Sequence, residues 1–242
     1  MKEAPEQPLG LLRRILPKRL QPCLRGLRRG WLRRNLKLEE PFRSVFPYTQ
    51  VGLTRLRALA WHAEGICRRR IVGDVVECGV LDGGSAAIMA AFTQKCGKRV
   101  HLFDAWEGLP ASTLEDGVLA RRWVGDIVGS PRRVIEVMRL LGVDESRLVT
   151  HKGWFKDTFP VAGIPSVALL HIDCDFYEAT RDCLERWFPV MSQGGIVQVD
   201  DYEDFVGSRT AVDKFLAAHP FIKLLHRGTS GKAYYFECKT GT

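Results

Sequence analysis

The 242-residue chain lacks several features that would identify whole classes of protein. It has no run of about 18 uninterrupted apolar residues, the length that a membrane-spanning helix needs. Its start, MKEAPEQP, is acidic and contains prolines, which is unlike a secretory signal. The seven cysteines show no CxxC spacing, and several lie in apolar runs. We therefore expect reduced thiols in a cytoplasmic protein, and neither a disulfide framework nor a zinc site.

The charge is uneven along the chain. The net charge of +8 comes from residues 1–38, which hold eleven Lys and Arg but only two Glu. Leucines and Trp31 lie between these basic residues, and Pro17 and Pro22 interrupt any long helix. We expect a basic arm over residues 1–40 and a single domain over residues 41–242. The arm could be a solvated extension, or it could contact an anionic membrane surface or an acidic partner. The remainder carries almost no net charge, so we expect no nucleic-acid binding.

Hydrophobic periodicity predicts the fold class. Apolar residues at helical spacing predict a helix from Thr49 to Arg69, after which short β-branched runs alternate with longer amphipathic segments. We expect strands at about 74–79, 99–104, 147–151, 166–172, 195–200, 221–226 and 233–237, and helices at about 84–96, 131–141, 177–190 and 208–218. The short loop 227–232 predicts an antiparallel final hairpin. This pattern is typical of the α/β class: a doubly wound, mostly parallel seven-stranded sheet, Rossmann-like as in class I methyltransferases, with a helical N-terminal extension.

A glycine-rich turn follows the first predicted strand. In GDVVECGVLDGGSAA (73–87) the strand runs into Gly79, then Gly83, before a helix that begins near Ser85. Glycines let the backbone approach a ligand, and free amides at a helix start can bind a carboxylate. A tight turn without a ligand would also explain the glycines. The spacing is not GxGxxG, which weakens the alternative of a nicotinamide-dependent oxidoreductase without excluding it.

Asp104 closes the second predicted strand, about twenty residues after that turn. A carboxylate there can accept hydrogen bonds from the ribose hydroxyls of an adenosine. The alternative is an aspartate that only caps a turn. The two motifs together favour a nucleoside-containing cofactor more than either does alone.

Aspartates follow two further predicted strands. Asp173 and Asp175 end the strand in HIDCDFYEAT (171–180), and Asp200 and Asp201 end the strand in GGIVQVDDY (194–202). Neighbouring strands lie about 5 Å apart, so these carboxylates should converge and repel one another unless a cation separates them. Oxygen ligands favour Mg²⁺, with Mn²⁺ or Ca²⁺ as alternatives. The competing interpretation makes the aspartates helix caps and turn formers, above all Asp175.

Six segments occur in an order and spacing that are typical of one enzyme family: PYTQVGLTRLRAL, GDVVECGVLDGGS, FDAWEGLP, GWFKDTFP, HIDCDFYEAT and GGIVQVDDY. From about Pro47 to Phe236 the chain resembles the macrocin O-methyltransferase (TylF) family, metal-dependent enzymes that methylate sugar hydroxyls. The resemblance implies S-adenosylmethionine as methyl donor and Mg²⁺ held by Asp173, Asp200 and Asp201, with Asp173 as candidate general base. It implies a donor site lined by Glu77, Gly79, Gly83, Ser85, Asp104 and Trp154, although Trp154 could equally be a packing aromatic. The segment from Leu109 to Arg133 resembles a substrate lid.

We therefore predict a Mg²⁺-dependent O-methyltransferase acting on a small molecule with adjacent hydroxyls, a saccharide or glycosylated natural product. The family likeness also makes a homo-oligomer the expected assembly. Two alternatives stay open: the nicotinamide oxidoreductase, and a membrane- or partner-docking module built on a degenerate methyltransferase fold.

Overall fold

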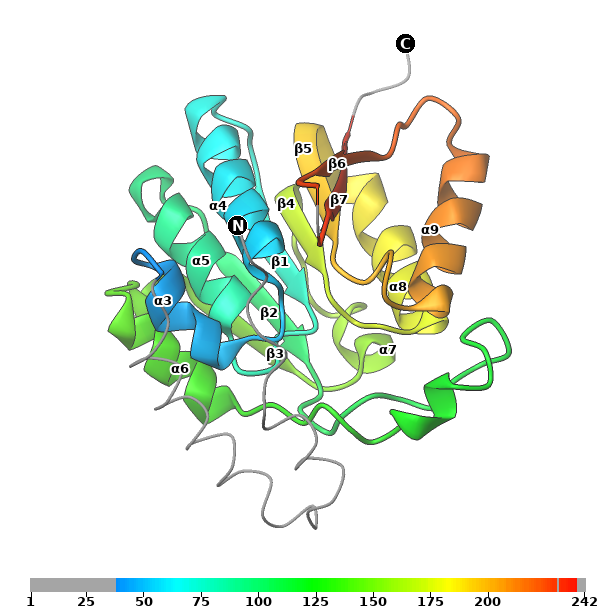
Figure 1. Cartoon of the computed structure of the whole chain (residues 1–242). Coiled ribbons are helices and arrows are strands. Elements are labelled where there is room, and N and C mark those ends of the chain that lie inside the picture. Colours follow the sequence, from blue (N-terminus) through cyan, green and yellow to red (C-terminus); the bar gives the residue numbers. More distant parts are fainter. Residues whose placement is uncertain (1–37, 230, 239–242) are drawn as a thin grey trace.

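The core of the protein is a seven-stranded sheet with strand order β3-β2-β1-β4-β5-β7-β6 (Figure 1). The computed structural model describes residues 38–229 and 231–238, so the predicted basic arm lies outside the described residues except for its end. The strands are β1 (Asp74–Cys78), β2 (Val100–Asp104), β3 (Leu148–Lys152), β4 (Val167–Ile172), β5 (Met191–Val199), β6 (Leu225–Arg227) and β7 (Ala233–Glu237). The first five pair in parallel, and β7 pairs antiparallel with both β5 and β6. The predicted fold class is confirmed.

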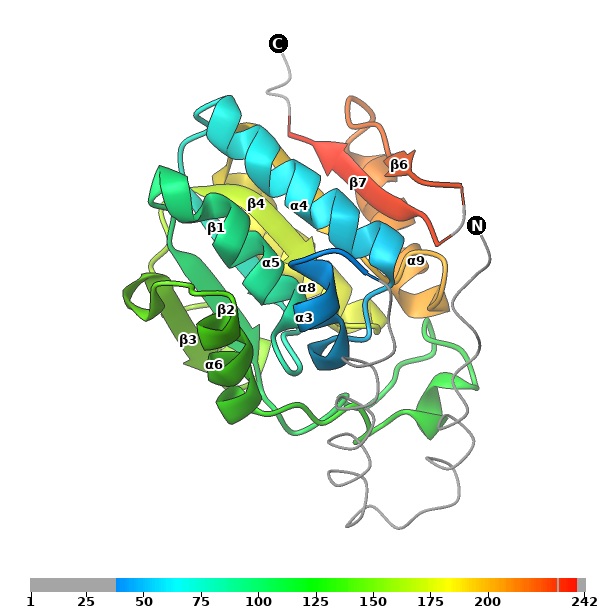
Figure 2. The same ribbon diagram turned by 60° about the vertical axis from the view of Figure 1, so that its left-hand side comes forward.

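Helices cover both faces of the sheet (Figures 1 and 2). One face carries α3 (Phe42–Val45), α4 (Leu53–Arg68), α5 (Gly84–Thr93) and α6 (Pro131–Leu140), and the other carries α7 (Phe155–Thr158), α8 (Tyr177–Trp187) and α9 (Val206–Ala218). Short 3₁₀ turns are η2 (Phe46–Tyr48), η3 (Gln94–Cys96), η4 (Ala120–Arg122), η5 (Glu145–Arg147) and η6 (Phe188–Val190). Of the helices within the described ranges, none combines the length and hydropathy needed to cross a bilayer.

Strand alternation divides the apolar residues between two cores. In β1, Val75 packs in the core under α4 and α5, while Val76 packs in the core under α8 and α9. Successive side chains of a strand point to opposite faces, so a strand between two helical layers must be apolar throughout. β4 is buried at all six positions and apolar at five of them, and His171 is the exception. The sheet is therefore fixed from both sides, and its carboxyl edge is a rigid platform.

Three element boundaries differ from the predictions by about four residues. α4 begins at Leu53 instead of Thr49, because Gly52 has an extended backbone and forms its N-cap. β5 begins at Met191 instead of near residue 195, because its pairing with β4 shifts register between Val167 and Leu169 and absorbs extra β5 residues that include Gly194 and Gly195. β6 is only Leu225–Arg227, a short edge strand, where the pattern predicted residues 221–226. None of these differences changes which aspartates follow β4 and β5.

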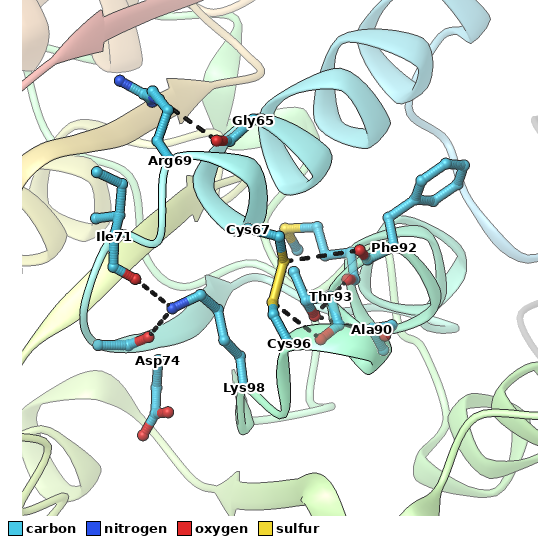
Figure 3. Close-up of a disulfide and its surroundings, with 12 residues drawn as sticks. Gly65, Cys67, Arg69, Ile71, Asp74, Ala90, Phe92, Thr93, Cys96 and Lys98 are labelled. Carbon is cyan, nitrogen blue, oxygen red and sulfur yellow. Dashed lines mark hydrogen bonds between the residues drawn. A yellow bond between two sulfur atoms is a disulfide. The ribbon is translucent and has the colours of Figure 1, made fainter.

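A disulfide joins Cys67, at the end of α4, to Cys96 in η3 (Figure 3). The expectation of reduced thiols throughout was therefore wrong for this pair, while Cys78, Cys174, Cys183 and Cys238 are free and buried. The two Cα atoms lie 5.8 Å apart although 29 positions separate them in sequence. Packing of α4 against α5 creates this proximity, and no local spacing signals it.

We predict that this disulfide stabilises the fold. Reduction, or Cys67→Ser, should lower the free energy of unfolding by about 2–4 kcal/mol, because an open chain regains loop entropy when it unfolds. Denaturant unfolding with and without dithiothreitol measures the change. The Cys67→Ser variant is the control, since dithiothreitol should not alter its stability. Equal stability of oxidised and reduced wild type would contradict the prediction.

Candidate active site

A cavity of about 600 Å³ opens at the carboxyl ends of the parallel strands. Its walls come from the loops after β1 (Gly79, Leu81), β2 (Asp104, Ala105), β3 (Gly153, Trp154), β4 (Asp173, Cys174, Asp175) and β5 (Asp200, Asp201, Asp204), with Arg55 from α4. This is the edge at which open α/β sheets bind ligands. Five loops far apart in sequence thus face one space.

The turn after β1 approaches β4 closely. Gly79 has φ +87°, and a Cβ at this position would lie 1.8 Å from the carbonyl oxygen of Asp173. The Asp173 amide in turn donates to the Cys78 carbonyl at 2.9 Å. Only glycine fits this backbone conformation and this contact. The glycine turn and the first aspartate of the predicted metal set are therefore held side by side.

Asp104 holds the same turn from the β2 side. Its Oδ2 accepts from the amides of Val80 (2.8 Å) and Leu81 (2.9 Å), and its Oδ1 accepts from the Trp106 amide at 2.6 Å. Burial raises the pKa of the Asp104 carboxyl, although these three donors oppose the rise. Asp104 thus acts as a cap for the turn and also lines the cavity. Its contact with a ribose stays a prediction.

The other predicted donor-site residues divide into two groups. Trp154 lines the cavity as the residue preceding α7. Glu77, Gly83 and Ser85 are not among the lining residues. Glu77 is fully buried and lies 2.8 Å from Nδ1 of His171, Gly83 precedes α5 and abuts Val134, and Ser85 is buried in the first turn of α5. These three residues shape the wall behind the cavity, and direct cofactor contact by them stays a prediction.

Asp173, Asp200 and Asp201 form one carboxylate cluster. Each offers an oxygen, and these oxygens lie within 4.8 Å of one another. Burial raises the pKa of Asp173 and of Asp201, and the neighbouring carboxylates raise both further. Oδ1 of Asp200 is buried without a hydrogen-bond partner among the described residues. All-oxygen donors with an unmet acceptor fit a hard divalent cation.

Asp175 has a different role from its neighbours. It is outside the cluster of three, and its side chain does not cap α8, whose N-cap is Phe176. Its φ is +62°, and its amide donates to Oδ2 of Asp201 at 3.0 Å. Burial, followed by the charges of Asp200 and Asp204, raises the pKa of Asp175 to about 7. The backbone of Asp175 therefore orients Asp201, while its own carboxyl faces the cavity.

Two cationic side chains offset the clustered charge. Nη1 of Arg55 lies 3.2 Å from Oδ2 of Asp200 and 2.8 Å from Oδ2 of Asp204. His171 is fully buried between Glu77 and Asp200, with its Nε2 3.9 Å from Oδ1 of Asp200. Burial lowers the pKa of His171, but the nearby carboxylates of Asp200 and Glu77 outweigh this and raise it to about 9. Sequence patterns indicated neither partnership, because both form between distant elements.

A loop between β2 and α6 covers the outer side of the cavity. We call residues 109–124 the cover segment. Its bounds are set by a bridge between Leu109 and Val124, where its two ends meet. Figure 1 shows this segment in green, running past the lower edge of the sheet toward α9. Leu109, Pro110, Leu119 and Trp123 line the cavity from it, beside Phe205. The wall of the cavity that the cover segment forms is therefore largely apolar.

The sheet order and the antiparallel β7 define a class I methyltransferase fold. The chain belongs to the macrocin-O-methyltransferase (TylF) family, whose model matches residues 28–233. It is 33% identical over 163 residues to the 8-demethyl-8-(2,3-dimethoxy-alpha-L-rhamnosyl)-tetracenomycin-C 4'-O-methyltransferase of Streptomyces olivaceus, a match covering 64% of this chain and 62% of that relative. The match thus spans less than two thirds of that relative's length.

Further similarities extend over more of the chain. The demethyldecarbamoylnovobiocin O-methyltransferase of Streptomyces niveus is 32% identical over 179 residues, which is 70% of this chain and 68% of that one. The solved structure of the O-methyltransferase NovP has a TM-score of 0.71 at 28% identity, and the match covers 79% of this chain and 82% of that one. The calicheamicin methyltransferase CalS11, with a TM-score of 0.67 at 20% identity over 98% of this chain and 99% of that one, shares the fold.

We predict that the metal-free protein loses stability as pH rises. The folded-state pKa of Asp175 is raised from 3.8 to about 7, so its stabilising protonation is lost as pH rises toward 7. The folded-state pKa of His171 is raised from 6.5 to about 9, so its contribution is complete below 6.5 and is lost as pH passes 9. Both titrations lower the free energy of unfolding as pH rises. The free energy of unfolding should fall by up to roughly 5 kcal/mol between about pH 5.5 and 9.

Denaturant unfolding in EDTA across that pH range measures this slope. Mg²⁺ should flatten it, because a cation bound at the neighbouring cluster would lower the pKa of both Asp175 and His171. A stability that stays constant or increases with pH in EDTA would contradict the raised pKa values of these two groups.

Proposed function

We propose that the protein is an S-adenosylmethionine-dependent O-methyltransferase that uses a divalent metal, Mg²⁺ in the first instance, to methylate a hydroxyl of a saccharide or glycosylated natural product. The observation that carries the proposal is the shared cavity. The glycine turn at Gly79 and the carboxylate cluster line the same space, and the backbones of Gly79 and Asp173 touch. A donor and a metal-bound acceptor could therefore meet without movement of the sheet.

The donor side of the cavity has the features that a nucleoside cofactor needs. The amides of Val80 and Leu81 are committed to Asp104, which keeps the turn in one shape. Oδ1 of Asp104 accepts one described hydrogen bond, from Trp106, and so keeps acceptor capacity toward the cavity. Trp154 supplies an aromatic wall. Bound S-adenosylmethionine would supply a methyl group made electrophilic by its sulfonium.

The acceptor side would hold a metal between Asp173, Asp200 and Asp201. A metal there would polarise an acceptor hydroxyl and lower its pKa. Arg55 and His171 fix Asp200 from two directions, so its carboxylate is oriented before any ligand arrives. Asp173 is the candidate base: it belongs to the cluster, its backbone contacts the glycine turn, and its carboxylate lines the cavity. This carboxylate could take the hydroxyl proton as the O–CH₃ bond forms and the S–CH₃ bond of the donor breaks.

The remaining lining supports a neutral, partly apolar acceptor. Among the described lining residues Arg55 is the only Lys or Arg, and it is already paired with Asp200 and Asp204. A diphosphate group would therefore meet carboxylates without a free Lys or Arg side chain to bind it. Leu109, Leu119 and Trp123 offer apolar surface instead. A sugar hydroxyl attached to an apolar aglycone suits both features, in keeping with the rhamnosyl group that appears in one relative's name.

We predict that S-adenosylhomocysteine binds and NAD does not. Isothermal titration into the full chain should give a Kd of the order of micromolar for S-adenosylhomocysteine, with no heat from NAD under the same conditions. Asp104→Ala should weaken this binding by about tenfold or more, because it removes both a ribose acceptor and the cap of the turn. Binding of NAD instead of S-adenosylhomocysteine would favour an oxidoreductase on this fold.

We predict that Asp173→Asn abolishes methyl transfer but leaves donor binding within about twofold, because amide for carboxylate removes charge and basicity at nearly constant shape. Methylation of a panel of aryl glycosides and S-adenosylhomocysteine titration measure the two effects. Asp182→Asn is the matched control, since Asp182 forms a surface pair with Arg181 on α8. The Mg²⁺-dependent rise in melting temperature should disappear in Asp173→Asn only. Turnover equal to wild type would refute the metal assignment.

A further inference from the structure

The cover segment is fastened to the body of the protein at one buried side chain, Asp116. We propose that Asp116 is a positioning residue that holds the cover segment over the acceptor side of the cavity by bridging it to the start of α8. This inference rests on the proposed function for its catalytic consequence, and on the described contacts alone for the fastening itself. Asp116 also lines the cavity, so the fastening point and the cavity wall are continuous.

Both carboxylate oxygens of Asp116 accept hydrogen bonds, one from α8 and the other from the cover segment itself. Oδ1 accepts from the amide of Tyr177, the first residue of α8, at 2.6 Å. Oδ2 accepts from the amide of Thr113 at 2.7 Å and from its hydroxyl at 2.9 Å, which closes the tip of the cover segment on itself. Asp116 is only 7% exposed. Hydrogen bonds to a buried carboxylate are among the stronger ones in proteins.

The start of α9 is shaped around the same side chain. A Cβ on Gly207 would lie 1.8 Å from Oδ1 of Asp116 and 2.7 Å from the Tyr177 amide nitrogen. Any residue other than glycine at position 207 would therefore displace the carboxylate. Asp116 is thus inserted between two helix starts, and each of these helices follows a strand that ends in cluster aspartates.

Little else holds the tip of the segment. Leu114 is 90% exposed and Val118 is 83% exposed, so burial of apolar surface does not secure this region. Glu115 approaches Lys214 at 3.7 Å, but both side chains are exposed and such a pair contributes little. Trp123 contacts the ring of Phe205 with centroids 6.3 Å apart, near the end of the segment. Release of Asp116 should therefore free the tip while its bridged ends stay in place.

Hydrogen–deuterium exchange on the full chain without ligands tests the fastening directly. In Asp116→Ala, peptides from 109–124 and the first amides of α8 should exchange about tenfold faster or more, while peptides of β1, β4 and β5 keep their wild-type rates. Glu115→Gln, one position away, should match wild type throughout. Asp116→Asn retains one acceptor and should give a smaller increase; it also serves if Asp116→Ala does not fold.

Kinetics test the catalytic consequence, with 4-nitrophenyl α-L-rhamnoside as the probe acceptor. The KM for the glycoside should rise by about tenfold or more in Asp116→Ala, while the KM for S-adenosylmethionine and the Kd for S-adenosylhomocysteine stay within about twofold. A purely structural role would instead lower kcat and weaken both substrates together. Gly207→Ala should reproduce the Asp116→Ala pattern by displacing the carboxylate.

The outcomes separate this proposal from the proposed function. Wild-type exchange in 109–124 of Asp116→Ala overturns the fastening, and faster exchange that spreads through the sheet does the same. If wild type does not methylate the glycoside, the exchange experiment alone decides: selective release of 109–124 supports the fastening even where methyl transfer has failed.

Discussion

The repulsion between Asp173, Asp200 and Asp201 is the constraint that the surrounding charged side chains must offset. Three carboxylates at the ends of adjacent strands cannot all be charged in a buried place without compensation. The fold supplies compensation from one helical layer and from the sheet: Arg55 comes from α4, and His171 comes from β4 itself. The buried Glu77 on β1 then balances the imidazole. What looks in sequence like an acidic cluster is a network of alternating charge that passes through the sheet.

Strand order makes this network coincide with the glycine turn. β1 and β4 are neighbours in the centre of the sheet although almost ninety residues lie between them. Their carboxyl ends lie so close that position 79 cannot carry a side chain. Had another strand lain between them, the glycine turn could not contact the backbone of Asp173. The proposed chemistry therefore depends on the central crossover of the fold as much as on any single side chain.

Much of this arrangement could be predicted from the sequence, because its signals are local. The strands before Gly79, Asp104, Asp173 and Asp200 are short apolar runs, and the aspartates follow them directly, so a parallel sheet alone brings them to one edge. The partners could not be predicted. Arg55 lies in an amphipathic helix like any other basic residue, and the proximity of Glu77 to His171 follows only from the pairing of β1 with β4.

The same reasoning explains the other differences. Cys67 and Cys96 meet because α4 packs on α5, and Asp116 meets Tyr177 because a loop folds back across the sheet edge; both are consequences of tertiary packing, to which periodicity is insensitive. The early start of β5 has a comparable origin. Its extra residues are accommodated by a register shift that depends on the partner strand, and the hydrophobic pattern of β5 alone contains no information about it.

The Cys67–Cys96 disulfide has a consequence beyond local stability. The covalent ring that it closes contains all of β1, the glycine turn and α5, and so includes Glu77, Gly79 and Ser85. The helix that carries Arg55 enters this ring at Cys67. Fluctuations that would separate the donor turn from α4 must therefore deform a closed loop of chain. The disulfide thus ties the glycine turn covalently to α4, whereas no disulfide among the described residues joins the cover segment to the rest of the cavity wall.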